Sequence, residues 1–318
     1  MQHHFLTAWL TVMAFGFLTP VLAAEQAPTI PADTSATPRT PWGDPDLQGI
    51  WNHGTATPLE RPDEYAGRAF LTNEEIAEAN RNATTFASSE RRAELSPERD
   101  VGLAYNQFWW DRGLSDGRTA LIIDPPDGRM PYTAEARSRG AGDRRPRGYD
   151  GPEDRNLWER CLTRGVPRLG GAYNNNFQLF QTPGYVVILH EMVHEVRVVP
   201  LDGPPHVGDS IRQWNGDSRG HWEGDTLVID TTNFTGETNY NGSTAGLHVV
   251  ERLTRVDAHT LNYEVTLGDP TVWTRPWTAA LALPMTEGQM YEYACHEGNY
   301  GMENLLRGAR VHEQAASK

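Results

Sequence analysis

The chain has 318 residues, of which 38% are hydrophobic, and a formal net charge of −14 at pH 7. This length and apolar content support one elaborated domain. The negative charge argues against a nucleic-acid partner and against binding to an anionic membrane surface, because both interactions need a basic face.

The N-terminal 24 residues have the pattern of a cleavable secretory signal. An apolar run over residues 5–22 is followed by the small residues Ala23 and Ala24, after either of which cleavage is expected. Residues 25–40 are rich in Pro, Ala and Thr and predict a flexible lead-in. We therefore expect a single folded domain over residues 41–318, in the periplasm or outside the cell, with no stable membrane insertion after signal cleavage.

The first half of this domain predicts loops with a few regular elements. Residues 48–51 read as a first strand, and its Gly49-x-Trp51 resembles the G-x-W that opens lipocalins, where the ring plugs the closed end of the barrel. A helix is expected from the capping signal at residues 71–75 to about residue 89. A strand follows at residues 119–124, and a short helix at residues 157–163.

Two stretches in this half have side chains suited to holding a ligand. Residues 105–111 are the densest aromatic cluster and include Trp109 and Trp110, which predict either a plug over a barrel mouth or a wall for ligand stacking. Tyr173 precedes a row of asparagines that includes Asn175. These amides form turns or line a polar pocket.

Residues 185–200 contain the spelling H-E-x-x-H at residues 190–194, which binds zinc when it lies on a helix. The flanking β-branched residues predict a strand instead. Histidines four residues apart on a strand stand roughly 13 Å apart, too far for one metal ion. A turn near Met192 would bring a histidine and a glutamate within cross-strand distance, as an acid/base dyad. The alternative is that both histidines are held by neighbours on a barrel wall.

The second half of the chain is persistently β-like, with short connectors and no helices of the length that a parallel sheet requires. One amphipathic helix is expected at residues 303–314. This pattern predicts a mainly β protein: an antiparallel, lipocalin-like barrel with N-terminal helical and loop elaborations and a C-terminal helix. A two-sheet sandwich or jelly roll is the alternative. The expected strands are residues 179–181, 185–200, 210–214, 220–223, 226–230, 247–256, 261–267, 273–283 and 290–294.

The chain has two cysteines, Cys161 and Cys295. In an exported protein the default expectation is a disulfide, with two free thiols as the alternative. A disulfide here would fix the polar residues around Cys295 and bring them near Tyr173 and the asparagines. No ligand set for a metal is predicted.

Three longer stretches, residues 42–51, 216–228 and 291–300, resemble a family of exported bacterial proteins with a lipocalin-like appearance. The resemblance covers most of the chain after residue 41. It implies export and a β-barrel, and it implies no particular reaction.

The polar residues that remain suit proton transfer. The sequence lacks a Gly-rich phosphate loop, a G-x-S-x-G elbow and a C-x-x-C pair. Histidine can act as a base, tyrosine or histidine as an acid, and arginine can steady an enolate or carboxylate. The predicted catalytic residues are His194, Glu191, Arg197, His221, Tyr293 and His296, and the predicted substrate-binding residues are Tyr173, Asn175, Trp109, Trp110 and Arg275.

Three functions compete. The leading hypothesis is a cofactor-independent lyase, dehydratase or isomerase/cyclase that acts on a small organic or glycosidic substrate in a barrel pocket. The second is a non-catalytic carrier, which predicts a deep apolar cavity with few titratable groups. The third is a metal-dependent hydrolase that uses His194, His221 or His296 brought together from different strands. An enzyme predicts that His and Glu or Tyr converge on a cleft.

Overall fold

The computed structural model describes residues 37–85, 93, 95–96, 110–141, 148–238 and 240–317, all of which belong to one compact unit, Thr34–Lys318. The predicted signal, most of the predicted lead-in and Trp109 lie outside the described residues. Arg39 pairs with Asp225 at 2.5 Å. The folded part thus includes residues ahead of the predicted boundary at residue 41.

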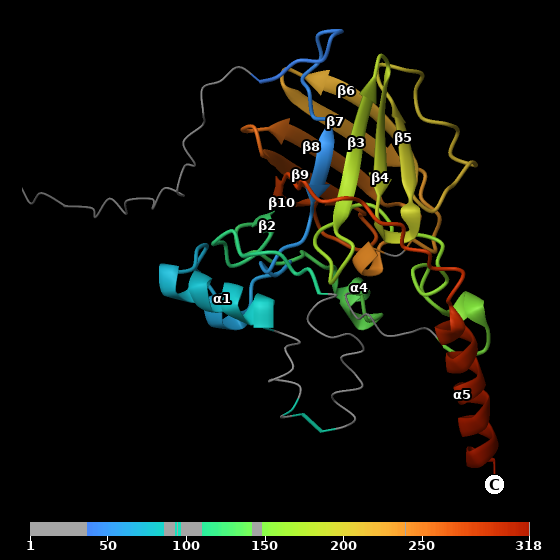
Figure 1. Cartoon of the computed structure of the whole chain (residues 1–318). Helices are drawn as coiled ribbons and strands as arrows, with labels where there is room; N and C mark the ends of the chain where they lie inside the picture. Colours follow the sequence, from blue (N-terminus) through green and yellow to red (C-terminus); the bar gives the residue numbers. More distant parts are fainter. Residues whose placement is uncertain are drawn as a thin grey trace, which may run out of the picture. The chain divides into compact units, whose positions relative to one another are not determined.

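Strands dominate the described chain, which confirms the predicted mainly β class (Figure 1). The strands are β1 (Gly49–Asn52), β2 (Ile122–Asp124), β3 (Asn176–Thr182), β4 (Tyr185–His190), β5 (Val196–Pro200), β6 (Asp217–Glu223), β7 (Thr226–Thr232), β8 (His248–Arg255), β9 (Thr260–Gly268) and β10 (Trp277–Pro284). The α-helices are α1 (Asn73–Thr85), α4 (Ala134–Ser138) and α5 (Tyr300–Ala316), and the 3-10 turns are Asp63–Tyr65, Pro152–Asp154, Met192–His194 and Tyr240–Gly242.

The strands form two antiparallel sheets, one with the order β1-β3-β4-β5 and one with the order β2-β10-β9-β8-β7-β6. One continuous apolar core contains side chains from both sheets, including Trp51 and Leu179 from the first and Val265 and Trp277 from the second. Single bridges link the sheets at their edges: Trp51 with Met285 beyond β10, and Leu201 beyond β5 with Gly220.

The stretch at residues 185–200 is a hairpin rather than one strand. β4 and β5 pair in antiparallel register, with Ile188 opposite Arg197, around the turn Met192–His194. Val193 and His194 have positive φ angles of 63° and 42°. The turn near Met192 that the sequence left open is therefore present, and H-E-x-x-H lies in a strand end and a tight turn, not on a helix.

Three predicted elements are wrong. Residues 210–214 form a loop with one isolated bridge, between Gln213 and Phe234, and the Asn233 amide donates to the Ile211 carbonyl at 3.1 Å. Residues 290–294 have no strand partner, and the backbone N–H of Tyr291 donates to the Glu191 carboxylate instead. Residues 157–163 form turns, because the positive φ of Cys161 (57°) is incompatible with a helix.

The disulfide between Cys161 and Cys295 is confirmed; their Cα atoms lie 5.6 Å apart. It ties the residues ahead of α5 to a loop 134 positions earlier in the chain. Helix α5 begins at a cap in which the Asn299 side chain accepts from the N–H of Met302. None of the helices among the described residues has the length and apolar character needed to cross a bilayer.

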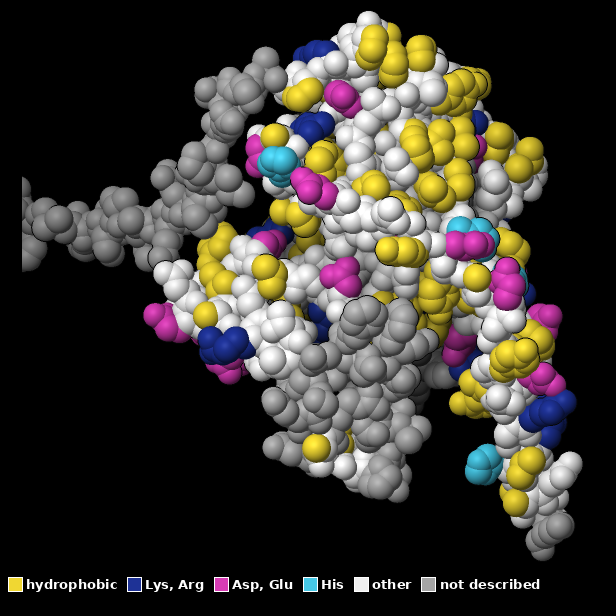
Figure 2. All heavy atoms as spheres, in the orientation of Figure 1, with side chains coloured by type: hydrophobic (Ala, Val, Ile, Leu, Met, Phe, Trp, Pro, Cys, Tyr) yellow, Lys and Arg dark blue, Asp and Glu magenta, His cyan; other side chains and the backbone are white. Residues whose placement is uncertain are grey.

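The outer face of the four-stranded sheet exposes apolar side chains. Tyr185, Val196 and Val198 are each about half exposed, and Figure 2 shows hydrophobic side chains gathered over this part of the surface. Strands β4 and β5 thus carry apolar residues on both faces, so polarity alone does not distinguish their inner from their outer side.

Two turn glycines in the six-stranded sheet offer a matched stability test. Gly216 and Gly224 have positive φ angles of 67° and 63°, but a Cβ on Gly216 would lie 2.4 Å from the Thr232 carbonyl oxygen, while a Cβ on Gly224 meets nothing within 4 Å. We expect Gly224→Ala to lower the free energy of unfolding by about 1 kcal/mol and Gly216→Ala by roughly 2 kcal/mol. Urea unfolding measures both, and equal losses would contradict the steric difference.

Candidate functional site

A small cavity lined by both charged and apolar side chains lies between the two sheets. Its volume is about 30 Å³, room for roughly one or two water molecules. Buried polar groups at such a site need partners, so their arrangement indicates function. The lining residues are His53, Val166, Arg168, Phe177, Ile188, His190, Arg197, Glu251, Leu253, Tyr263 and Leu283.

A buried ion pair spans the space between the sheets. Arg197 on β5 donates to both carboxylate oxygens of Glu251 on β8, at 2.5 and 3.0 Å, and the Tyr263 hydroxyl on β9 donates to the same carboxylate at 2.8 Å. The side chains of Arg197 and Glu251 are 9% and 5% exposed. Although burial disfavours the charge on Arg197, the charge and hydrogen bonds of Glu251 outweigh it and raise the pKa of the guanidinium.

Tyr263 remains protonated at this position. Burial, and next the negative charge of Glu251, raise the pKa of its phenol well above 10. The hydroxyl is therefore a hydrogen-bond donor at neutral pH, and its bond to Glu251 holds its orientation.

Two histidines, the buried His53 and the partly exposed His190, line the same cavity as neutral bases. Burial, followed by the charge of Arg168, lowers the pKa of His53 from 6.5 to about 3. The same two causes hold the pKa of His190 well below 6.5. Neither ring nitrogen of His53 has a hydrogen-bond partner on another residue, and Nδ1 of His190 has none. Both rings pack near Phe177, with centroids 6.3 and 5.5 Å from it.

A second ion pair borders the cavity. Arg168 pairs with Glu195, and the side chains are 9% and 10% exposed. The Glu195 carboxylate also accepts from Thr163 and Asn215. Burial lowers the pKa of Arg168, and the negative charge of Glu195 offsets part of this shift, so that the resulting pKa is about 10. Each arginine thus has its own carboxylate, while both imidazoles lie without one.

Among the sequence-predicted catalytic residues, Arg197 lines this cavity. Glu191 is buried and accepts the N–H of Tyr291 at 2.9 Å, so its contact is with the chain ahead of α5. His194 lies in the turn after β4, with Nδ1 3.4 Å from the Tyr293 carbonyl oxygen. The turn does bring a histidine opposite a glutamate: the backbone N–H of His190 donates to the backbone carbonyl of Glu195 at 2.8 Å, but the Glu195 carboxylate pairs with Arg168 and not with the imidazole. Nδ1 of His194 lies 3.9 Å from a carboxylate oxygen of Glu292.

The predicted binding residues gather outside this cavity. The ring centroid of Tyr173 lies 6.1 Å from that of Tyr293 and 6.3 Å from that of Trp110. The amide of Asn175 donates to the carbonyl oxygens of Asp111 and Gly171 and holds the backbone. The disulfide thus brings Tyr293 to Tyr173, as the sequence predicted.

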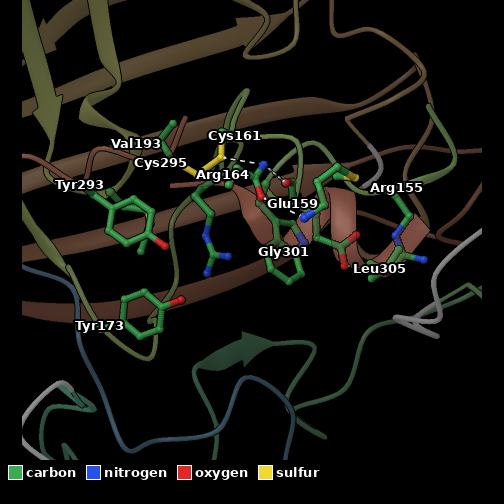
Figure 3. Close-up of a pocket in the computed structure, with 14 residues that line it drawn as sticks. Arg155, Glu159, Cys161, Arg164, Tyr173, Val193, Tyr293, Cys295, Gly301 and Leu305 are labelled. Atoms are coloured by element: carbon green, nitrogen blue, oxygen red, sulfur yellow. Dashed lines mark hydrogen bonds and ion pairs between the residues drawn. A yellow bond between two sulfur atoms is a disulfide. The ribbon is translucent and has the colours of Figure 1, made fainter. Parts of the chain in front are cut away.

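Of the predicted catalytic and substrate-binding residues in the described part of the chain, only Arg197, Tyr173 and Tyr293 line this cavity or the one beside the disulfide (Figure 3). His221 is exposed beside Glu223 on β6, and His296 is exposed after the disulfide. Arg275 is exposed and pairs with Asp124 instead of lying between Trp273 and Trp277, because the two tryptophans are buried against each other with centroids 5.5 Å apart.

Four of the polar residues in the cavity were missed: His53, Arg168, Glu251 and Tyr263. A signal for Glu251 was present in the sequence, since β8 alternates and this acid occupies an inward position between Val249 and Leu253. His53 and Arg168 lie in loops, where no alternation of apolar and polar residues indicates which side chains point into the core.

The described residues contain no group of three or more His, Cys, Asp or Glu side chains that could hold a metal ion. His194, His221 and His296 form no such group. Comparison of the chain with protein-family models, with curated proteins and with solved structures finds no match.

Proposed function

We propose that the cavity between the sheets is the active site of an acid/base enzyme that needs no cofactor: a lyase, dehydratase or isomerase/cyclase acting on a small organic or glycosidic substrate. One observation carries the proposal. Two uncharged imidazoles without carboxylate partners, of which His53 is buried and His190 partly exposed, share a cavity with a protonated tyrosine and a fixed arginine–glutamate pair. Such convergence of titratable groups is typical of catalytic sites.

In this proposal His190 removes a proton from the substrate, and the Nε–H of Arg197, a buried donor without a hydrogen-bond partner in the described structure, donates to the oxygen that gains charge. The single O–H of Tyr263 stays on Glu251 and holds that carboxylate in place. A depressed pKa makes an isolated imidazole a weak base. An anionic group on the substrate would offset the charges of Arg168 and Arg197 and raise the pKa of His190 toward its working range. The site therefore favours substrates that bear a carboxylate or form an enolate.

The surrounding fold is proposed to be a lipocalin-like barrel. The single bridges at both sheet edges support closure, because they link β1 to the end of β10 and β5 to β6. A substrate needs more room than about 30 Å³. Residues 165–171 carry Val166 and Arg168 and contain Gly165 and Gly170 at positive φ, so this segment is the proposed entrance.

The carrier hypothesis predicts an apolar cavity, whereas six of the eleven lining residues here can titrate. That composition favours the enzyme. We also propose that the protein works in the periplasm or outside the cell, where its disulfide is stable.

The test is proton exchange in D₂O, followed by ¹H NMR, with a panel of small hydroxy acids, keto acids and glycosides. We expect the loss of a substrate C–H resonance or the growth of a vinyl resonance. His190→Asn should slow this change by at least ~100-fold, while the exposed His312→Asn should leave it intact. A molecule that binds, as seen by native mass spectrometry, and is released unchanged would identify a carrier and overturn the proposal.

A further inference from the structure

Five nitrogen atoms in the lining of the cavity between the sheets are buried without a hydrogen-bond partner on another described residue: Nδ1 and Nε2 of His53, Nδ1 of His190, and Nε of Arg168 and of Arg197. Each arginine Nε carries a proton and can only donate, and a neutral imidazole has one N–H. Whichever ring nitrogen of His53 carries its proton, the lining thus has three buried donors that no described group accepts, one from each of His53, Arg168 and Arg197.

The acceptors of the same lining are already engaged. Its side-chain oxygens belong to Glu251 and Tyr263, and the Glu251 carboxylate accepts from Arg197 and from the Tyr263 hydroxyl. A group that brings oxygen acceptors and no donor of its own is therefore the complement of this cavity. A carboxylate meets that requirement, because its oxygens accept strong hydrogen bonds from guanidinium and imidazolium nitrogens.

The size of the cavity limits the group that it can hold. A volume of about 30 Å³ has room for roughly one or two water molecules. That space suits a carboxylate and not a bulkier oxyanion such as a phosphate. The remainder of a larger acid would extend toward residues 165–171, the proposed entrance.

The charge balance of the site requires a proton to accompany the anion. Arg197 pairs with Glu251 and Arg168 with Glu195, and all four side chains are at most 10% exposed, so the two pairs contribute no net charge. Both imidazoles are neutral, because burial and the charge of Arg168 lower their pKa values. A carboxylate that entered alone would be a buried charge without a counter-charge, which is strongly unfavourable.

His53 is the group best placed to take up this proton. It is 4% exposed, and both of its ring nitrogens lack a partner, so a second proton gives the ring an N–H for the carboxylate. A bound carboxylate also offsets the guanidinium charges that disfavour a proton on His53. The titratable and charged side chains that act on His53 or face it across the cavity are those of Arg164, Arg168, His190, Arg197, Glu251 and Tyr263.

We propose that the cavity binds a small carboxylic acid as an anion together with a proton: the carboxylate accepts from the Nε–H of Arg168 and from His53, and His53 holds the proton. This inference rests on the proposed active site and names its substrate class. The Nε–H of Arg197 and the imidazole of His190 remain for the atoms that react.

The probe is sodium formate, the smallest carboxylate, with formamide as its uncharged analogue and sodium chloride as the matched salt. The dependence of urea unfolding on probe concentration gives the affinity, since a ligand that binds only the folded protein stabilises it. Three non-hydrogen atoms limit the formate Kd to about 1 mM or weaker. We expect formate to bind at least ~10-fold more tightly than formamide or chloride at pH 5. Equal stabilisation by all three, or none, would overturn the proposal.

Uptake of a proton has its own readout. Formate stays ionised between pH 7 and pH 5, so an anion that binds alone has the same affinity at both. If the complex holds one more proton than the free protein, the formate Kd should fall at least ~10-fold from pH 7 to pH 5. An unchanged Kd would contradict the proton coupling and with it the proposal.

Variants assign the groups. His53→Phe should abolish this pH dependence, whereas the exposed His312→Gln should keep it. Arg168→Lys retains a positive charge for Glu195 but places a methylene where Nε lies, so it should raise the formate Kd at least ~10-fold. Arg160→Lys, which alters an arginine outside this cavity, should leave the Kd unchanged. A pH dependence that persists in His53→Phe would show that the proton goes elsewhere and would overturn the assignment.

These outcomes separate this inference from the proposed function, because formate binding needs no turnover. If formate binds as expected and no acid exchanges a proton in D₂O, the carboxylate site stands and the enzyme proposal fails. If exchange occurs only in substrates without a carboxylate and formate does not bind, the active site stands and this inference fails.

Discussion

Replacing Arg197 by methionine is expected to lower the free energy of unfolding by about 3 to 5 kcal/mol, because it leaves the Glu251 carboxylate buried without its counter-charge. The two side chains are at most 9% exposed and share two hydrogen bonds. Glu251→Gln should cost a similar amount through the unpaired guanidinium. Denaturant unfolding at pH 7 measures both losses.

The neighbouring residue on β8 supplies the control. Arg252 points outward and pairs with Glu223 at 2.7 Å, with side chains 39% and 49% exposed. Surface pairs contribute about 0 to 1 kcal/mol, so Arg252→Met should have little effect. The double substitution Arg197→Met with Glu251→Leu should cost less than the sum of the single changes. Similar losses for Arg197→Met and Arg252→Met would contradict the description of the pair as buried.

Much of the β architecture was predictable because strand signals are local. β-branched runs, alternation and turn residues indicated β3, β6, β7, β8 and β9 close to their observed positions. The single strand predicted for residues 185–200 was wrong because the β-branched Val193 lies in the turn between the two strands, where it adopts a positive φ that its type disfavours. The strand predicted for residues 210–214 is reduced to a single bridge between Gln213 and Phe234, because the neighbouring Ile211 carbonyl accepts from the Asn233 side chain and not from a strand partner.

The candidate site was less predictable because it depends on which inward-facing side chains of the two sheets lie in contact with one another. The sequence indicated that Arg197 and His190 belong to one long β element with acidic neighbours. In a continuous strand the even-numbered His190 and the odd-numbered Arg197 would point to opposite faces. The turn at Met192–His194 shifts this alternation, so that both line the cavity. Glu251 and Tyr263 come from the other sheet, and their meeting with Arg197 follows only from how the two sheets pack. Pairing of Cys161 with Cys295 was predictable because two cysteines allow one intramolecular bond.

Acidification from pH 7 to pH 5 is expected to destabilise the protein through the two histidines of the cavity. The unfolded chain takes up a proton at His53 near pH 6.5, whereas the folded chain does so only near pH 3. Between these values the unfolded state binds more protons, so stability falls as the pH falls. His53 alone should remove about 2 kcal/mol by pH 5, and His190, whose pKa is also lowered, adds to the loss.

Other histidines change the total loss of stability on acidification, but not the part of it that is assigned to His53. The pKa of His248 is raised by its hydrogen bond to Asp230, so His248 stabilises the folded state in acid and opposes the trend. The measurement is urea unfolding of the wild type, His53→Phe and the exposed His312→Gln at pH 7 and pH 5. His53→Phe keeps a ring beside Phe177 and should make the loss on acidification smaller by about 2 kcal/mol, while His312→Gln should leave it unchanged. An identical pH dependence in all three proteins would show that His53 is accessible to protons in the folded state, and would remove the basis for a neutral imidazole in the cavity.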